Sequence, residues 1–318
     1  MLSTPELQNS LDVRNFKFLR QVLKDAETAD IGEVFNDLTI EQAIVLFRLV
    51  PKVRRAAVFS YMAFERQEEL LEELPDIVVT SVVNDMEPDD RTRLLEELPF
   101  EIRSKILLRL SPDERRKAWQ LLSYPEDSVG RLMTPEFFAI DAETIVAHAL
   151  ERIRWEAQDY PEEMLSIILV KDENGKYLGE LSLATLVTAD PPTKKIGEYM
   201  GSQYVALNVN DDQIVAVDVF RKYDRHFLPV VNNDNILKGI VTADDVFDIA
   251  ESEATEDIQQ FGGSATLEDS YFQTPLLSLF KARAGWLVIL FLGGIATAAA
   301  LRHYEEVTLE LAWLVVFL

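Results

Sequence analysis

Residues 226–246, HFLPVVNNDNILKGIVTADDV, decide the fold of the central part of this 318-residue chain. An apolar run rich in β-formers leads into a polar turn of Asn and Asp residues, and a second apolar run follows that contains a glycine. Thr242-Ala-Asp-Asp then starts a helix-forming segment. This order predicts two strands joined by a turn and followed by a helix.

The same order occurs earlier in the chain, at residues 166–182, SIILVKDENGKYLGELS. A related short motif opens each copy, GRLM at 130–133 and GEYM at 197–200, and the pair Pro191-Pro192 separates the copies. We therefore expect two β-α-β-β-α units. Their predicted bounds are 128–193 and 194–250.

A different repeat occupies residues 1–127, where apolar positions recur every 24 residues. These positions are Leu38, Met62, Met86 and Leu110. Thr39 and Ser111 each have the residue type and the context of a helix N-cap, and Glu114 is expected to complete a capping box with Ser111. A fixed period of this kind predicts stacked pairs of short helices, an all-α superhelical solenoid.

Composition limits the classes of function. The 31 Lys and Arg residues against 55 Asp and Glu residues give a formal charge of −24, which would repel nucleic acid and attract cations. The chain has no cysteine, so thiolate metal sites are excluded and a bound divalent ion would be a hard one such as magnesium or calcium. We expect no enzyme, since no phosphate-binding glycine loop and no Ser/His/Asp constellation is present.

An acidic helix is predicted over residues 243–268. Its first fifteen residues, 243–257, carry seven carboxylates and no basic residue. Like charges at helical spacing cost about 0.2–0.5 kcal/mol per pair. Two interpretations stay open: a solvated face, which charge runs usually form, or a face that binds cations.

A transmembrane helix is predicted at residues 284–301, which are uncharged over a length of about 27 Å. Lys281 and Arg283 precede it, so the N-terminal side is expected in the cytoplasm, and no signal peptide is predicted. A buried core helix is the alternative. The last residues, LELAWLVVFL at 309–318, are too few to cross, so we expect the segment 276–318 to be the start of a membrane domain whose second span is truncated.

Taken together, the two copies resemble tandem CBS modules, and the whole chain resembles the N-terminal part of an MgtE-type magnesium transporter. The phrases SVGRLMTPE, LPVV, TADDV and EATEDI carry this resemblance. It implies a magnesium transporter or channel of the cell (inner) membrane, multi-pass, with cytoplasmic N-terminal domains and a homodimer formed through the CBS domains. It also implies that Mg²⁺ bridges acidic faces and favours the closed state.

The resemblance further implies a set of carboxylates that bind magnesium. They are Asp89, Asp212, Asp224, Asp245, Asp248, Glu253, Glu256 and Asp257. Ile214 and Arg93 stand where further acids are expected, so we expect either fewer ions or an arginine acting as a fixed counter-charge.

CBS pairs also imply an adenine nucleotide such as ATP, with Thr242 and Asp245 holding the ribose. The same two residues equally form a helix-capping pair. In the first copy, residues 182–185 contain no acid, which speaks against a nucleotide site there. The alternative functions are therefore a nucleotide-sensing CBS module of a membrane protein and, with the solenoid as its binding surface, a docking scaffold.

Overall fold

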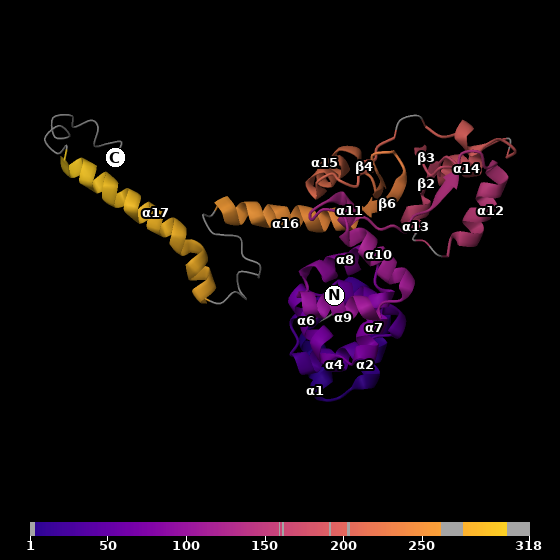
Figure 1. Ribbon diagram of the computed structural model, residues 1–318. Coiled ribbons are helices and arrows are strands. Elements are labelled where there is room, and N and C mark those ends of the chain that lie inside the picture. The colour runs from indigo at the N-terminus through magenta and orange to yellow at the C-terminus, as the bar shows by residue number, and fades with distance from the viewer. Residues whose placement is uncertain are drawn as a thin grey trace. The chain divides into compact units, whose positions relative to one another are not determined.

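The computed structural model describes residues 4–158, 160, 162–190, 192–201, 204–261 and 276–303. The chain divides into two compact units, Met1–Val246 and Phe247–Leu318. The first unit contains the helical N-terminal part and both α/β modules (Figure 1). The boundary between the units lies inside the helix that follows the second module.

The N-terminal part is built from consecutive short helices, which confirms the predicted solenoid (Figure 1). Their bounds are α1 (Thr4–Asp12), α2 (Phe16–Asp25), α3 (Thr28–Asn36), α4 (Ile40–Leu49), η1 (Lys52–Arg54), α5 (Arg55–Ser60), α6 (Phe64–Glu73), α7 (Asp76–Asp85), α8 (Pro88–Glu97), α9 (Phe100–Arg109) and α10 (Pro112–Leu122). Helices α4, α6, α8 and α10 begin at residues 40, 64, 88 and 112, so the 24-residue sequence period is the period of the helix pairs. The recurring apolar positions are buried in one common core because each pair packs on the next.

Two helix starts illustrate how local sequence sets these elements. Thr39 forms a complete capping box with Gln42 at the start of α4, as the sequence predicts. Ser111 also caps α10 by accepting a hydrogen bond from the Glu114 amide at 3.3 Å. The second bond expected of a capping box, from the Ser111 amide to the Glu114 carboxylate, does not form. The Ser111 amide donates instead to Asn84 Oδ1 at 2.8 Å, so this prediction is wrong. The Glu114 carboxylate is therefore available for other partners.

The two α/β modules have the predicted order of elements and the same sheet topology. The first contains α11 (Val129–Leu132), β1 (Ala139–Asp141), α12 (Val146–Glu156), α13 (Glu162–Leu165), β2 (Ile167–Lys171), β3 (Tyr177–Ser182) and α14 (Leu183–Thr188). The second contains η2 (Ile196–Glu198), β4 (Leu207–Asn208), α15 (Gln213–Tyr223), β5 (Phe227–Val231) and β6 (Leu237–Thr242). In each sheet a parallel pair is followed by an antiparallel pair, in the orders β1-β2-β3 and β4-β5-β6.

Backbone hydrogen bonds join the modules to each other and to the segment that precedes them. The amide of Tyr177 donates to the Asn235 carbonyl at 2.8 Å, so the two hairpin turns pair. Thr134 and Ile240 exchange amide-to-carbonyl bonds at 2.9 and 3.0 Å, which adds the segment after α11 to the edge of β6. Gly239 permits this contact, because a Cβ there would lie 2.5 Å from the Thr134 carbonyl oxygen.

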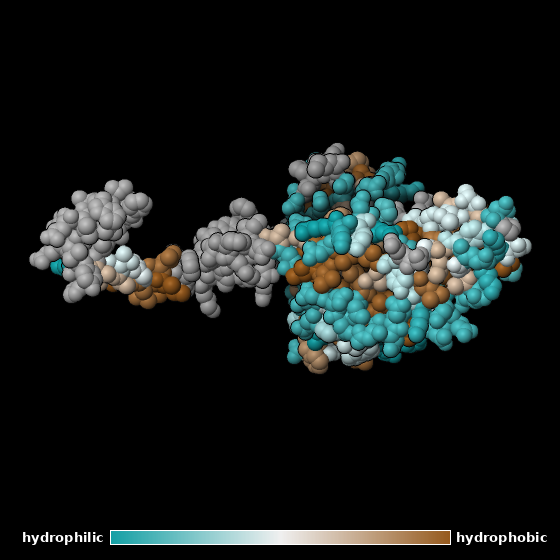
Figure 2. Space-filling view, turned by 90° about the horizontal axis from the view of Figure 1, so that it is seen from above, coloured by the Kyte–Doolittle hydropathy of each residue, from teal (hydrophilic) through white to brown (hydrophobic). Residues whose placement is uncertain are grey.

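Two helices follow the second module. The predicted acidic helix is α16 (Ala243–Phe261), and residues 262–268 of the prediction lie outside the described residues. Helix α17 (Leu276–His303) includes the predicted span 284–301, and its described apolar side chains are exposed and form a hydrophobic surface (Figure 2). None of the helices, taken over the residues that the structure describes, combines the length and the apolar character needed to cross a membrane. Residues 304–318, with the predicted second span, lie outside that description.

Candidate functional site

Carboxylates from three segments far apart in the sequence meet within the first unit. Helix α8 contributes Asp89 and Asp90 from its first turn, and Glu87 is its N-cap residue. Helix α16 contributes Asp245 from its own first turn. Acidic side chains near a helix N-terminus are favoured by the helix dipole, which explains why each segment tolerates them separately but not why they face each other.

Asp89 is the most unusual member of this group. Its side chain is 8% exposed, and its Oδ1 atom has no hydrogen-bond partner. Burial raises its pKa well above the ordinary value of 3.8, and repulsion from Asp245, Asp90 and Glu87 raises it further. A buried carboxylate in this state lacks the counter-charge that normally accompanies one.

Asp245 faces Asp89 from the second module. Its Oδ2 accepts a hydrogen bond of 2.6 Å from the Thr242 hydroxyl, which fixes the carboxylate at the junction of β6 and α16. Burial raises its pKa to about 7; the Thr242 and Asp89 hydrogen bonds act in the opposite direction, while repulsion from Asp244 and Asp90 adds to the increase. Thr242 and Asp245 are therefore bonded to each other at the contact with the helical domain, and their predicted role at a nucleotide ribose stays a prediction.

Four further acids surround this pair, and the sequence analysis missed them as site residues. Glu87 has a raised pKa because of burial and of repulsion from Asp90, Asp244 and Glu136. Glu87 and Asp90 flank Asp89 in the motif MEPDD, and Asp244 precedes Asp245, so proximity in the sequence could have indicated them. Glu136 carries no such signal, since it reaches the group only through the fold.

Two arginines on α8 lie next to these acids in the sequence and have different partners. Arg93 Nη2 pairs with Asp90 Oδ1 at 3.0 Å, one helix turn away on α8. Arg91 is 1% exposed and donates to the backbone carbonyls of Val83 and Met86 at 2.7 and 2.6 Å. Arg91 thus serves the interior of the helical domain, and the Oδ1 atom of Asp89 stays without a hydrogen-bond partner.

The structure does not bring the other predicted ligands of the second module to this group. Asp212 is the N-cap of α15 and accepts from the Ile214 amide at 2.9 Å, while Asp224 follows the C-terminus of the same helix with a φ of 50°. Asp212 and Asp224 flank the eleven residues of α15, a separation of about 18 Å along the helix, so they cannot ligate one ion together. A role for either residue in binding magnesium stays a prediction.

The remaining predicted ligands lie on the part of α16 that belongs to the second unit. Asp248 is exposed and Glu253 is partly exposed. The side chains of Glu256 and Asp257 lie outside the described residues.

The donor set suits magnesium better than any soft metal. Within the described ranges, no group of three or more His, Asp or Glu side chains is placed so that it could hold a metal ion. Mg²⁺ does not require one, because it keeps several of its waters and is typically held by one or two carboxylates. The free oxygen of Asp89 beside Asp245 provides that number of ligands at a buried interface. Asp89 and Asp245 would hold the ion, and the neighbouring acids would face its water shell.

The first module lacks the equivalent of the Thr242–Asp245 pair. Ser182 instead caps α14, accepting from the Thr185 amide at 3.0 Å and sharing a 2.8 Å hydrogen bond with the Thr185 hydroxyl. A purely structural capping role therefore accounts for this position.

Comparison with known proteins supports the resemblance throughout the chain. Residues 26–127 match the family of the MgtE intracellular N domain, and residues 129–191 and 196–252 match the CBS domain family. The magnesium transporter MgtE of Thermus thermophilus is 36% identical over 304 residues, covering 95% of this chain and 67% of the relative. The magnesium transporter MgtE of Enterococcus faecalis is 33% identical over 199 residues, and the match covers 63% of this chain and 43% of that protein.

Solved structures agree with this result. The cytosolic domain of the Mg²⁺ channel MgtE in complex with ATP matches with a TM-score of 0.71 at 32% identity, covering 78% of this chain and all of the other. The soluble part of a magnesium transporter matches with a TM-score of 0.70 at 25% identity, covering 79% of this chain and 98% of the other.

Proposed function

Because the chain belongs to the MgtE family of magnesium transporters, we propose that its N-terminal part senses magnesium and gates the transport of that ion. In this proposal Mg²⁺ bridges the helical domain and the second CBS module and so favours the closed state. The chain spans two thirds of the Thermus relative and less than half of the Enterococcus relative. Transport itself, a multi-pass location in the inner membrane with a cytoplasmic N-terminal part, and a homodimer formed through the CBS domains all belong to the proposal.

The observation that carries the proposal is the free, buried Oδ1 of Asp89 opposite Asp245. Two carboxylates in contact repel each other, and the low dielectric of a buried interface strengthens this repulsion. A divalent cation between them converts the repulsion into attraction. An ion bound only by the docked arrangement stabilises that arrangement in proportion to the logarithm of its concentration.

The position of Asp245 gives this binding a consequence beyond the interface. Asp245 lies in the first turn of α16, so movement of the helical domain away from the CBS pair releases the start of that helix. A ligand shifts such an equilibrium only by its difference in affinity for the two states. A bridging ion has this difference because the undocked state offers only one side of its site.

Hydrogen exchange of the 318-residue chain in detergent micelles tests the proposal. We expect millimolar Mg²⁺ to slow exchange at the starts of α8 and α16 relative to EDTA, and we expect the double change Asp89→Asn and Asp245→Asn to abolish this difference. The matched control is Asp113→Asn, 24 residues after Asp89, where the carboxylate is 77% exposed and pairs with Arg116. Equal exchange in Mg²⁺ and EDTA for the unaltered chain would overturn the proposal.

A second function is supported by the ATP complex of the related cytosolic domain. We propose that an adenine nucleotide binds the CBS pair with Thr242 and Asp245 at its ribose. The ribose and the magnesium ion would both bind the Asp245 carboxylate, which the Thr242 hydroxyl holds in one orientation. Nucleotide and magnesium would therefore compete for this carboxylate. Calorimetric titration with ATP should show binding that Thr242→Ala removes and that Thr185→Ala, at the capping site of the first module, leaves in place. Binding of equal affinity in both variants would exclude this site.

A further inference from the structure

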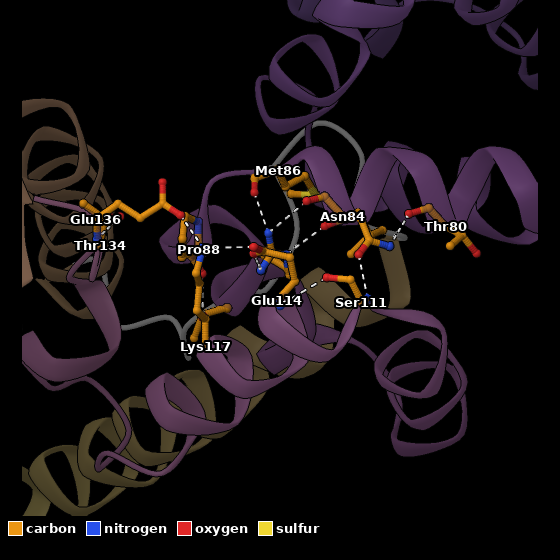
Figure 3. Close-up of polar contacts among 12 residues, drawn as sticks. Thr80, Asn84, Met86, Pro88, Ser111, Glu114, Lys117, Thr134 and Glu136 are labelled. Atoms are coloured by element: carbon orange, nitrogen blue, oxygen red, sulfur yellow. Dashed lines mark hydrogen bonds and ion pairs between the residues drawn. The ribbon is translucent and has the colours of Figure 1, made fainter. Parts of the chain in front are cut away.

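Lys117 connects the helical domain to the segment that opens the CBS part, and it lies beside the acidic group. Its Nζ donates to Glu114 Oε1 at 2.9 Å on its own helix, α10. The same atom donates to Glu136 on the segment that follows α11 (Figure 3). The lysine therefore joins a carboxylate of the helical domain to a carboxylate of the CBS part.

The contact is anchored in the core of the helical domain. Glu114 Oε2 pairs with Arg91 Nη1 at 2.6 Å, so one carboxylate connects the lysine to a buried arginine. Arg91 in turn is held by the Val83 and Met86 carbonyls. On the side of the helical domain, Lys117 is thus held by Glu114 and Arg91, without the help of a metal ion.

On the other side the contact leads to the start of α16. Glu136 lies two residues after Thr134, whose backbone bonds attach this segment to Ile240 on β6. Strand β6 ends at Thr242, and Asp245 follows in the next helix turn. Lys117 therefore holds the sheet edge that positions the predicted magnesium ligand.

The charges around Glu136 show why a fixed cation is needed there. Glu136 is among the carboxylates that raise the pKa of Glu87. Partial burial alone would lower the pKa of Lys117, but the hydrogen bonds to Glu136 and Glu114 raise it above its ordinary value. The side chain therefore stays an ammonium ion over the whole physiological range.

We propose that Lys117 is a resident counter-ion that keeps the helical domain against the CBS pair and thereby sets the magnesium concentration at which the interface closes. This inference rests on the proposed function and adds a residue that tunes it. An ion arriving at two carboxylates that are already held together meets a higher effective concentration of its second ligand. Less magnesium is then required for closure than at two faces that separate fully.

The side chains of Lys117 and Glu136 are 31% and 54% exposed, so their pair belongs to the weak, partly screened class. We expect Lys117→Met to raise the half-saturating Mg²⁺ concentration about two- to fivefold, the range that corresponds to such a pair. Methionine keeps the length of the stem, and Glu114 keeps its partner Arg91. The variant is therefore expected to remain folded.

The experiment is a Mg²⁺ titration of hydrogen exchange at the start of α16 in the full 318-residue chain. The control is Arg116→Met, which removes the same charge from the neighbouring position of α10, where the side chain is 76% exposed and pairs with Asp113 of its own helix. Arg116→Met should leave the half-saturating concentration unchanged.

Two outcomes separate this inference from the proposed function. If the unaltered chain does not respond to Mg²⁺, the proposed function has failed, and the contact is judged from exchange in EDTA, where Lys117→Met should still be less protected than Arg116→Met. If the chain responds but Lys117→Met and Arg116→Met titrate alike, the assignment of Lys117 is overturned while magnesium sensing stands.

Discussion

Asp89 and Arg91 lie two residues apart on α8, and both are buried, yet their surroundings differ completely. Arg91 has three backbone carbonyls and Glu114 as partners. Asp89 has an oxygen with none, and it faces further carboxylates. Buried charges without compensation are costly, and proteins keep them mainly where a ligand supplies the opposite charge. In our proposal, magnesium supplies the opposite charge that Asp89 lacks.

The raised pKa values at this pair predict how pH and magnesium interact. Burial and like charges lift the pKa of Asp245 from 3.8 to about 7, so over that window the docked state binds a proton that a separated, solvated carboxylate releases. In EDTA, protection of the interface should fall as pH rises through this window. Mg²⁺ binds the ionised carboxylates, so its added protection should grow between about pH 5.5 and pH 8.

Hydrogen exchange corrected for its intrinsic pH dependence measures this effect. The Asp89→Asn, Asp245→Asn variant should lose both trends, whereas Asp113→Asn should keep them. Magnesium protection of the same size at both pH values would show that these carboxylates do not titrate at the interface.

At the scale of elements, the sequence predicts what depends on local repetition. The 24-residue period predicted the helix pairs because every pair buries the same apolar positions, such as Leu38 and Met86. The strands and turns of both CBS modules were likewise predictable, because each copy repeats the same order of apolar runs and polar turn residues. The approach of Glu136 to Glu87 was not predictable, because it depends on how α8 packs against the segment after α11. The capping box expected of Glu114 does not form because the Ser111 amide donates to Asn84, a residue of the preceding repeat.

The pairing of this segment with β6 yields a test at the level of elements. Gly239→Ala would place a Cβ 2.5 Å from the Thr134 carbonyl oxygen, so the edge contact must open. We expect a loss of about 1–3 kcal/mol in the free energy of unfolding of the CBS part, which is typical of overpacking a tight site. Gly197→Ala, whose nearest contact would be 3.3 Å, should cost less. Denaturant unfolding followed by circular dichroism compares the two, and equal losses would contradict a specific role for the Thr134 contact.

For the molecule as a whole, the excess of 55 acids over 31 bases makes separation of its acidic modules the default when counter-ions are scarce. Lys117 and Arg93 offset only a part of that charge at the interface. The remainder is available to a divalent ion whose concentration varies in the cell. The basic side chains and the magnesium ion would then have separate roles. The side chains keep the modules in register at any magnesium concentration, and the bound ion makes closure of the interface depend on that concentration.

The absence of cysteine allows the resulting motion to be measured directly, because two introduced cysteines can be spin-labelled without background. Val53 in the helical domain and Trp155 in the first CBS module are 93% and 84% exposed, so Val53→Cys and Trp155→Cys should not disturb the fold. Pulsed electron resonance on labelled chains diluted with unlabelled ones, which suppresses distances between subunits, should give a narrow distance distribution in Mg²⁺ and a broader one in EDTA. Asp89→Asn with Asp245→Asn should make the distribution independent of Mg²⁺, and Lys117→Met should broaden it at low Mg²⁺ only. A distribution that is narrow in both conditions would mean that the helical domain does not move, and magnesium would then have to act on this chain by another route.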